Sequence, residues 1–473
     1  MDQGTVPEDG TFYGLCTPQL YGSLADDRLR QRFLGIIEVA TLPSGPSMPS
    51  FVVEGGIPLS GSIRPTGNKN AALPCISAAL LTEDPVTLEN VPRIRDVETL
   101  LELMVSLGVS VEWIGDGTLR LQASQLNGTN PDPTLSARIR ASILLAGPLL
   151  ARVGRVTIPP PGGDVIGRRR LDTHFLAFRG LGAEIRIDED RIEITADALK
   201  GGDVFLDEPS VTATENAVLA AVGARGTTTL RNAAAEPHVQ DMCSLLNEMG
   251  ASISGIGTHV LHIEGVEALG GATLRLQSDH IEVGSFIGLA AVTGGVLRIE
   301  DVPTEHLDST LLGFEKLGVC CERAGADLVV RGDLGKEIQR DAFGHIARID
   351  DGPWPGFPPD LTSIALVTAT QCRGTVLVHE KMFESRMFFT DKLVSMGAQI
   401  ILCDPHRAVV VGPSPLRAQP LESPDIRAGM ALLLAALAAE GISRIQNIGQ
   451  IERGYERVDE RLRGLGARIS RVD

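Results

Sequence analysis

Residues 67–74 (GNKNAALP) are the first part of this sequence with residue types suited to chemistry. Lys69 and Asn70 follow a strand-like segment and directly precede the apolar helical run CISAALLT. The first backbone N–H groups of a helix have no partner within the helix, and together with a lysine they can hold an anion. Glycine-rich turns with a lysine also occur as solvated surface turns, so this segment alone does not identify a ligand.

One pattern of helix and strand recurs six times and must position such residues. Each copy is an amphipathic helix that ends in an apolar residue, followed by a glycine, by Val or Ala, and by a short alternating strand. Glycine just past a helix end adopts the left-handed C-cap conformation, and the alternation that follows is typical of a half-buried strand. The copies lie roughly 70 residues apart, and their glycines are Gly108, Gly182, Gly250, Gly318, Gly397 and Gly466.

Four of these helices are preceded by a strand that closes in a turn at Asn or Asp, in TLENVP, TLRNAA, RIEDVP and RIQNIG. Such a turn provides the stop that a strand-to-helix reversal needs. The pattern predicts six βαβ-type units, and three units per domain would divide the chain into two domains. The same repeats would also suit a stacked scaffold or a ring-shaped clamp without chemistry.

The charge and the hydropathy of the chain exclude two classes of partner. The 473 residues include 43 Lys and Arg against 60 Asp and Glu, a net charge of −17. This balance argues against a broad nucleic-acid surface but allows a local cationic pocket. The longest nearly apolar run, residues 428–439, is shorter than the roughly 20 residues that span a bilayer. We therefore expect neither a nucleic acid nor a membrane as partner.

The cysteines and the first residues indicate the compartment. Seven cysteines without a CxxC pair argue against a disulfide framework and against a cysteine–histidine metal site, so no metal is expected. The start of the chain is acidic, so a signal peptide is not expected and the protein is predicted to be cytoplasmic. Residues 1–47 lie outside the repeats and are predicted to be an extension of unassigned role. A first pair of strands is predicted from Met48 onward.

The segment GNKNAALP, continued by LLTEDPVTLENVPRIRDV, resembles the start of the enolpyruvyltransferase family, and within it the UDP-N-acetylglucosamine 1-carboxyvinyltransferases. The shikimate-pathway branch of the family carries a different, serine-rich turn at this place. The resemblance extends from about residue 50 to 472 through motifs in the family order, namely RASILLAGPLLAR, PPPGGDVIGRRRLDTH, SVTATEN, DHIEVGSF, FPPDL, FESRM, DIRAG and IERGYER. Chance explains one or two such matches but not eight matches in the same order as in the family.

The fold that this resemblance implies is an α/β fold of two domains. Each domain would be an inside-out α/β barrel of three repeats, with helices inside and sheets outside. One domain would comprise residues 48–68 and 278–473, and the other would comprise 69–277. The substrate cleft would lie between them, under a mobile lid at 159–170 whose prolines and double glycine give it stiff and flexible ends.

The reaction that the resemblance implies is transfer of the enolpyruvyl group of phosphoenolpyruvate to the 3′-hydroxyl of UDP-N-acetylglucosamine, a uridine nucleotide sugar, with release of phosphate. This transferase reaction begins peptidoglycan precursor synthesis for the cell wall. It proceeds by addition and elimination, so it needs one base near the hydroxyl and one acid near C3 of phosphoenolpyruvate. No cofactor is implied.

The family pattern also implies roles for individual residues. Lys69, Asp164 and Asp360 match catalytic positions, although an aspartate at 360 could instead only cap the following helix. Guanidinium groups suit the two anionic groups of phosphoenolpyruvate, whose binding positions are matched by Lys69, Asn70, Arg140, Arg169 and Arg453, and at the carboxylate by Arg386 and Arg427. The positions for the UDP-sugar are matched by Asn70, Arg140, Arg169, Asp172, Ser210, Val211, Thr212, Asp360 and Met382, with residues 169–174 as a uridine-facing strand.

Three positions depart from the family pattern. Asp164 stands where most members carry a cysteine, and a carboxylate can relay a proton but is not readily alkylated by an epoxide. Glu208 replaces a lysine that is common beside the substrate diphosphate, and Thr212 replaces a glycine. The last two leave another uridine nucleotide, such as UMP, open as the acceptor. A catalytically silent sugar-nucleotide sensor is also open, although a sensor would not need Asp164 and Asp360.

Overall fold

The computed structural model describes residues 49–164 and 166–472. Residues 48–473 form one compact unit, and the predicted extension at 1–47 lies outside the described residues. No helix in the described ranges is long and apolar enough to cross a membrane.

Buried apolar side chains form two separate clusters. The first core takes its residues from 51–63 and 281–469, and the second core takes its residues from 71–276. The chain therefore begins in the first core, builds the second core from one continuous segment, and returns to the first. The predicted domain boundaries fall between these segments, and the division into domains stays a prediction.

Three sheets of four strands belong to the first core. In the order of neighbouring strands they are β21 (Pro420–Glu422), β22 (Ile442–Gln446), β1 (Ser50–Glu54) and β23 (Arg468–Val472); β15 (Cys320–Ala324), β16 (Asp327–Arg331), β14 (Val296–Ile299) and β2 (Gly61–Ile63); and β17 (Ala347–Asp350), β18 (Gly374–His379), β20 (Arg407–Gly412) and β19 (Gln399–Asp404). Each sheet contains one parallel pair, respectively β21–β22, β2–β14 and β17–β18, beside antiparallel pairs. This mixture is what a βαβ crossover followed by a hairpin produces.

The second core has two sheets of four strands and one of three. They are β13 (Thr273–Arg275), β3 (Val86–Glu89), β5 (Thr118–Gln122) and β4 (Ser110–Gly115); β11 (Ser252–Ser254), β12 (Val260–Glu264), β10 (Thr227–Arg231) and β9 (Asp203–Phe205); and β6 (Arg155–Ile158), β8 (Ile192–Thr195) and β7 (Glu184–Ile187). The three-stranded sheet lacks a parallel strand beside β6. The chain there is irregular, and the carbonyl of Thr129 accepts a hydrogen bond of 3.2 Å from the amide of Thr157.

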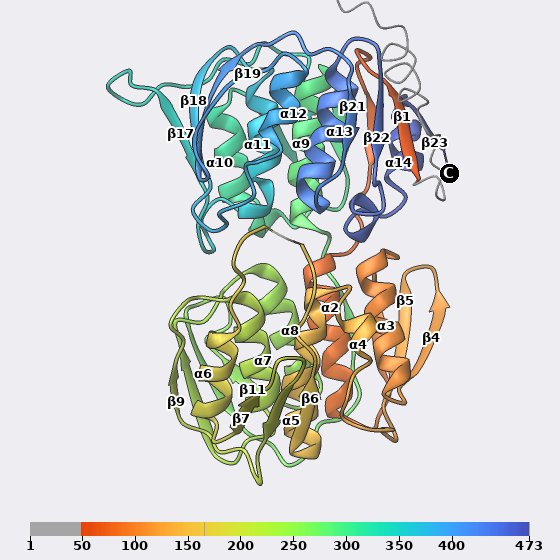
Figure 1. Cartoon of the computed structure of the whole chain (residues 1–473), viewed down its shortest axis with the longest axis vertical. Coiled ribbons are helices and arrows are strands. Elements are labelled where there is room, and N and C mark those ends of the chain that lie inside the picture. Colours follow the sequence, from red (N-terminus) through yellow and green to blue (C-terminus); the bar gives the residue numbers. More distant parts are fainter. Residues whose placement is uncertain (1–48, 165, 473) are drawn as a thin grey trace, which may run out of the picture. The chain divides into compact units, whose positions relative to one another are not determined.

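Helices α9 (His280–Thr293), α11 (Thr362–Ala369) and α13 (Ile426–Ala438) pack against one another in the first core, between β17–β19 and the strands β1 and β21–β23 (Figure 1). They are buried on nearly every face, and helices that are apolar all round must be enclosed. Each contacts a different sheet, α9 at β14, α11 at β18 and α13 at β22. The other helical segments here are η3 (Thr304–His306), α10 (Asp308–Lys316), η4 (Pro359–Leu361), α12 (Thr390–Ser395), η5 (Ile451–Arg453) and α14 (Val458–Gly464).

The second core repeats this arrangement. Its buried helices are α2 (Lys69–Ala78), α7 (Val211–Ala221) and the 3-10 turn η2 (Arg140–Leu145), which continues as α5 (Ala146–Val153) and contacts both α2 and α7. The remaining helical segments are η1 (Ala79–Leu81), α3 (Arg95–Ser106), α4 (Pro133–Ser136), α6 (Asp172–Gly180) and α8 (Pro237–Glu248). The six sheets therefore confirm the prediction of six helix-and-sheet units.

The backbone angles confirm the local predictions that led to these units. All six repeat glycines have positive φ, from 79° at Gly318 to 106° at Gly397. The predicted stops also adopt the left-handed conformation, with φ of 58° at Asn90, 57° at Asn232, 54° at Asp301 and 57° at Asn447. Asn and Asp tolerate this conformation better than other residues with side chains.

The prediction of a first strand pair is wrong. β1 pairs with β22 and β23, whereas β2 pairs with β14 of another sheet. The connection between them contains Pro58 and no two-residue hairpin turn, so it carries the chain from one sheet to the next instead of reversing it.

Two chain segments pass side by side between the cores. The amide of Asn68 donates to the carbonyl of Gln277 at 2.8 Å, and the amide of Asp279 donates to the carbonyl of Thr66 at 2.8 Å. Gly67 and Ser278 form an antiparallel bridge between these bonds. These crossings bring the starts of α2 and α9 next to each other.

Candidate active site

A cavity of about 370 Å³ lies where six helical segments begin. Its lining includes the first residues of α2, η2, α7, α9, η4 and α13, namely Lys69, Arg140, Val211, His280, Pro359 and Ile426. Each helix start carries partial positive charge and unpaired N–H groups. Their convergence favours an anionic ligand although the whole chain is acidic.

The structure brings all but one of the predicted site residues to this cavity. Its lining contains Lys69, Asn70, Arg140, Asp164, Arg169, Ser210, Val211, Thr212, Asp360, Met382, Arg386, Arg427 and Arg453. Asp172 is absent from the lining and is exposed at the first position of α6. The predicted strand at 169–174 is also wrong, because these residues form a loop and the first turn of α6, where an aspartate complements the helix dipole.

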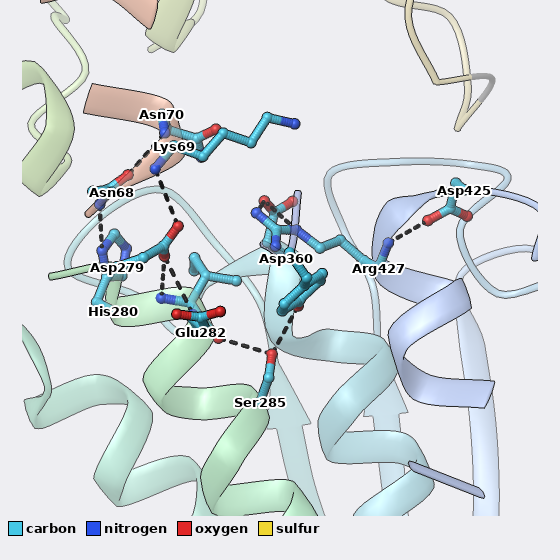
Figure 2. A network of polar contacts seen from close by, with 12 residues as sticks. Asn68, Lys69, Asn70, Asp279, His280, Glu282, Ser285, Asp360, Asp425 and Arg427 are labelled. Carbon is cyan, nitrogen blue, oxygen red and sulfur yellow. Dashed lines mark hydrogen bonds and ion pairs between the residues drawn. The ribbon is translucent and has the colours of Figure 1, made fainter. Parts of the chain in front are cut away.

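Asp360 is held by two buried arginines. Its Oδ1 accepts from Nη2 of Arg386 at 3.0 Å, and its Oδ2 accepts from Nε of Arg427 at 3.0 Å. Figure 2 shows Asp360 and Arg427 side by side. Burial raises the pKa of Asp360, but Arg427, Arg386 and Lys69 outweigh it and hold the pKa below its usual range. The alternative that Asp360 caps a helix is wrong, since neither η4 nor α11 has a side-chain cap.

Arg386 has a second acidic neighbour. Its Nε lies 3.6 Å from Oε2 of Glu380, which is fully buried. Burial raises the pKa of Glu380 to about 9, against the lowering effect of Arg386 and with a further rise from Asp351. Burial thus disfavours a charge on Glu380, and Asp360, at 3.0 Å, is the nearer counter-ion of Arg386.

A chain of ion pairs links Lys69 to the predicted lid. Nζ of Lys69 lies 2.7 Å from Asp96, and Nε of Arg453 donates to the same carboxylate at 2.8 Å. Arg453 also pairs with Asp164. Burial raises the pKa of Asp96, but Lys69 and Arg453 reverse that shift and lower it. Asp96 thus fixes two cations of the cavity, and it was missed because its segment shows only a turn signal.

Arg140 and Arg169 lie together, and the charges of Asp164 and Asp360 act on Arg169 only from beyond ion-pair distance. Nη2 of Arg140 donates to the carbonyl of Arg169 at 2.8 Å, and neither guanidinium forms an ion pair within the described residues. Burial and the charge of Arg169 lower the pKa of Arg140 to about 10. Two adjacent cations that repel each other at a cavity wall are stabilised by an anion between them.

The lid residues lie against both cores. A Cβ at Gly162 would lie 1.8 Å from the carbonyl oxygen of Ala137, so only glycine fits there. On the other side, the amide of Ser385 donates to the carbonyl of Ile166 at 3.1 Å, and the amide of Arg168 donates to Glu384 at 3.2 Å. Asp164 reaches the cavity from this loop. The mobility of the lid stays a prediction.

The two departures near the predicted diphosphate position have partners. Glu208 accepts from Arg170 at 3.4 Å, so its charge is paired. Oγ1 of Thr212 lies 3.1 Å from Nε2 of His174. The acid therefore opposes a bound diphosphate less than its sequence position suggests.

Three aromatic residues in the lining were not found from the sequence. They are His238 on α8, His280 on α9 and Trp354 in the loop after β17. The rings of His238 and His280 are stacked with centroids 6.3 Å apart, and Trp354 meets His280 edge-on at 6.1 Å. These residues come from three separate segments, so no local spacing could have grouped them.

Metal-binding and disulfide chemistry are limited by the side chains present. In residues 49–164 and 166–472, no group of three or more His, Cys, Asp or Glu is placed to hold a metal ion. The six cysteines in these ranges are free thiols.

Comparisons with known proteins agree with this geometry. Residues 53–462 match the family model described as EPSP synthase (3-phosphoshikimate 1-carboxyvinyltransferase). A UDP-N-acetylglucosamine 1-carboxyvinyltransferase of Bradyrhizobium diazoefficiens is 63% identical over 422 residues, which cover 89% of this chain and 98% of the relative. A protein of the same name from Treponema denticola is 54% identical, with 89% and 99% covered.

Solved structures show the same fold. The enolpyruvyl transferase NikO of Streptomyces tendae is 26% identical, with a TM-score of 0.81 and coverage of 90% of this chain and 99% of that one. An EPSP synthase of Acinetobacter baumannii has a TM-score of 0.69 at 18% identity, with 90% and 100% covered. The second likeness concerns the fold alone.

Proposed function

Because this chain belongs to the EPSP synthase family, we propose that it transfers the enolpyruvyl group of phosphoenolpyruvate to the 3′-hydroxyl of UDP-N-acetylglucosamine and releases phosphate. The protein is a transferase, and its relatives at 54–63% identity carry the name of this activity. Its product is a precursor of peptidoglycan, and we place the reaction in the cytoplasm. The observation that carries the proposal is the cationic cavity at the six helix starts.

Phosphoenolpyruvate binds through its two anionic groups. Lys69, Arg140, Arg169 and Arg453 contact the phosphate, with Asn70 beside them, and Arg386 and Arg427 contact the carboxylate. The unpaired guanidinium groups of Arg140 and Arg169 support the phosphate assignment. The burial of Arg386 and Arg427, each under 5% exposed, supports the carboxylate assignment, since a buried cation requires a permanent counter-charge.

Asp360 is the base of the addition step. The substrate carboxylate competes with Asp360 for Arg386 and Arg427, and the loss of these partners raises the pKa of Asp360 and its proton affinity. Asp360 takes the proton of the sugar hydroxyl, and the hydroxyl oxygen bonds to C2 of phosphoenolpyruvate at the same time. Asp164, which becomes protonated when the substrate phosphate takes Arg453 from it, gives its proton to C3 in the same step, and Lys69 and Arg453 balance the charge.

The elimination step restores both carboxyl groups. C3 returns a proton to Asp164, the C2–O bond to phosphate breaks, and the double bond forms again between C2 and C3. Phosphate leaves with the electron pair of the broken bond and with the proton that Asp360 had taken. Lys69, Arg140 and Arg169 stabilise its charge as it departs.

The acceptor binds along the second core. Ser210, Val211 and Thr212 at the start of α7 hold the diphosphate, and no side chain caps the first amides of this helix. Asp360 and Met382 contact the sugar. We place the uridine near residues 169–172, although Asp172 itself lies outside the cavity lining. We also propose that the two cores are two domains, 48–68 with 278–473 and 69–277, which close on the bound nucleotide.

The test is release of phosphate from phosphoenolpyruvate with four acceptors: UDP-N-acetylglucosamine, UDP, UMP and shikimate 3-phosphate. We expect release only with UDP-N-acetylglucosamine, and its loss in Asp360→Asn. Release with UMP would transfer the assignment to another uridine nucleotide. Binding of the nucleotide sugar without any release would indicate a sensor and overturn the proposed function.

A further inference from the structure

His280 has a fixed protonation pattern. Oδ1 of Asn68 accepts from the amides of Asn70 and Ala71 at 2.9 and 3.2 Å, so its Nδ2 must be the donor group. That donor lies 3.1 Å from Nδ1 of His280 (Figure 2). Nδ1 therefore accepts, and the ring proton resides on Nε2.

The surroundings keep His280 neutral. Burial lowers the pKa of His280 to about 3, with further lowering by His306 and Arg427 and an opposing effect of Asp360. A protonated ring would also present a second donor to Nδ2 of Asn68. His280 is thus a neutral donor at all physiological pH values.

The Nε2–H group of His280 has no partner in the part of the chain that the structure describes. His280 lines the cavity, and no hydrogen bond to its Nε2 exists within the described residues. Nε2 is not fully buried either, so it is open to the cavity that His280 lines. A neutral donor suits a neutral oxygen of a ligand, since the phosphate and carboxylate groups have the arginines.

The neighbouring surface suits a small apolar group. His238 is stacked on His280, and Trp354 meets it edge-on. His238 is neutral as well, because burial and then His280 lower its pKa to about 3. A ligand group that combines a carbonyl oxygen with a methyl group fits this place, because the oxygen can accept from Nε2–H of His280 and the methyl group can contact the uncharged rings. On an N-acetylhexosamine, the acetamido group at C2 adjoins the 3-hydroxyl that faces Asp360, whose charge acts on His280.

We propose that Nε2–H of His280 donates a hydrogen bond to the carbonyl oxygen of the acceptor's acetamido group, whose methyl group contacts the rings of His238 and Trp354. His280 is then the residue that selects an N-acetylated sugar over one with a 2-hydroxyl. The assignment rests on the proposed function, because it places the acceptor hydroxyl at Asp360.

Calorimetric titration of the full chain with UDP-N-acetylglucosamine and with UDP-glucose tests this selection, since binding of UDP-glucose requires no turnover. We expect His280→Ala to weaken binding of UDP-N-acetylglucosamine roughly 10–100-fold and binding of UDP-glucose less than threefold. His280→Gln, which keeps a donor near the place of Nε2, should retain most of the preference.

His306→Ala is the matched control. His306 contacts Trp354 at 5.8 Å between ring centroids but does not line the cavity. Its loss should leave the preference unchanged. Equal weakening of both nucleotide sugars in His280→Ala, or the same loss of preference in His306→Ala, would overturn the assignment.

Nitrogen NMR gives a readout that does not depend on binding. The His280 signals, identified by their absence in His280→Gln, should show the Nε2–H tautomer without titration between pH 6 and pH 8. An Nδ1–H tautomer or a titrating ring would contradict the inference. Failure of the proposed function is distinct, because it would appear as no phosphate release by the unaltered protein.

Discussion

The helix starts of the two cores differ in the acidic residues that they bring to the same cavity. In the first core, Asp279 and Asp425 cap α9 and α13 with their carboxylates, and Asp360 lies in η4 before α11. In the second core, α2 begins after Asn68 and α7 after Ser210. The second core also presents Lys69 and Arg140 at the starts of α2 and η2, and the first turns of α2, η2 and α7 contain no acidic residue.

This difference separates anion binding from proton transfer, two tasks that the helix starts of either core could perform. Every helix start supplies the same partial positive charge. At α9 and α13 a carboxylate cap cancels that charge, and at η4 the carboxylate of Asp360, which caps no helix, is available for proton chemistry, with Arg386 and Arg427 as counter-ions. A neutral cap leaves the charge to a ligand. The diphosphate and most of the phosphate contacts are therefore assigned to the second core, whereas the carboxylate contacts of Arg386 and Arg427 and the base Asp360 are assigned to the first.

The largest effect is expected at Asp164, the one proton-relay group that the second core supplies. Asp164→Asn should lower turnover roughly 10²–10⁴-fold with unchanged nucleotide binding, because an amide cannot relay the proton. Steady-state phosphate release measures this.

Asp164→Cys should keep turnover and become sensitive to the epoxide fosfomycin, whereas the unaltered enzyme should resist it. Normal turnover of the Asn variant, or covalent inactivation of the unaltered enzyme at position 164, would remove Asp164 from the mechanism.

Arg427→Ala tests the counter-ions of the first core. Loss of a buried, charge-assisted contact should weaken phosphoenolpyruvate binding by about 2–5 kcal/mol. Arg407→Ala is the control, because Arg407 pairs with Asp404 on the surface, where ion pairs contribute little. An unchanged apparent affinity in Arg427→Ala would show that the carboxylate binds elsewhere.

Asp241 shows what a buried carboxyl does without an arginine. It lies in α8 at 7% exposure, and burial with Glu305 raises its pKa to about 7, although a backbone contact at Gln277 opposes the shift. The folded state then binds more protons than the unfolded state between about pH 4 and pH 7. The free energy of unfolding should fall across this range as pH rises, by on the order of 2–4 kcal/mol from this group.

Urea unfolding of the unaltered protein and of Asp241→Asn at several pH values checks this sign. The Asn variant should gain relative stability as pH rises towards 8. Parallel curves for the two proteins would show that Asp241 keeps an ordinary pKa.

Ser210→Asp gives the smallest effect and makes α7 resemble the helices of the first core. A carboxylate at this helix start should weaken UDP-N-acetylglucosamine binding roughly tenfold by repelling the diphosphate. Ser210→Asn, which matches aspartate in size but carries no charge, should bind the nucleotide sugar more tightly than Ser210→Asp. If the two variants bind alike, the diphosphate does not lie at α7.

The local sequence was sufficient for the repeat architecture. Gly108 and its five equivalents must adopt positive φ, and Asn90 and its equivalents end strands, because these residues act on their own backbone. The first strands were misjudged, since the pairing of β1 depends on strands at the far end of the chain.

The candidate site divides in the same way. Residues in long motifs, such as Arg427 in DIRAG, were predicted and lie in the cavity. Asp96, His238 and His280 were missed, because only tertiary packing brings α3, α8 and α9 together. Asp172 was misplaced, since a motif fixes its position in the chain but not the direction of its side chain.

The pairing of β1 has a consequence for synthesis on the ribosome. β1 lies between β22 and β23, so its two edges are completed by the last strands of the chain. Roughly 390 residues separate β1 from β22, which at about 5–20 residues per second is a delay of roughly 20–80 s. The continuous second core can fold during that interval, whereas β1 must wait with both edges unpaired. A nascent chain that stalls before residue 442 therefore exposes an apolar strand that invites aggregation.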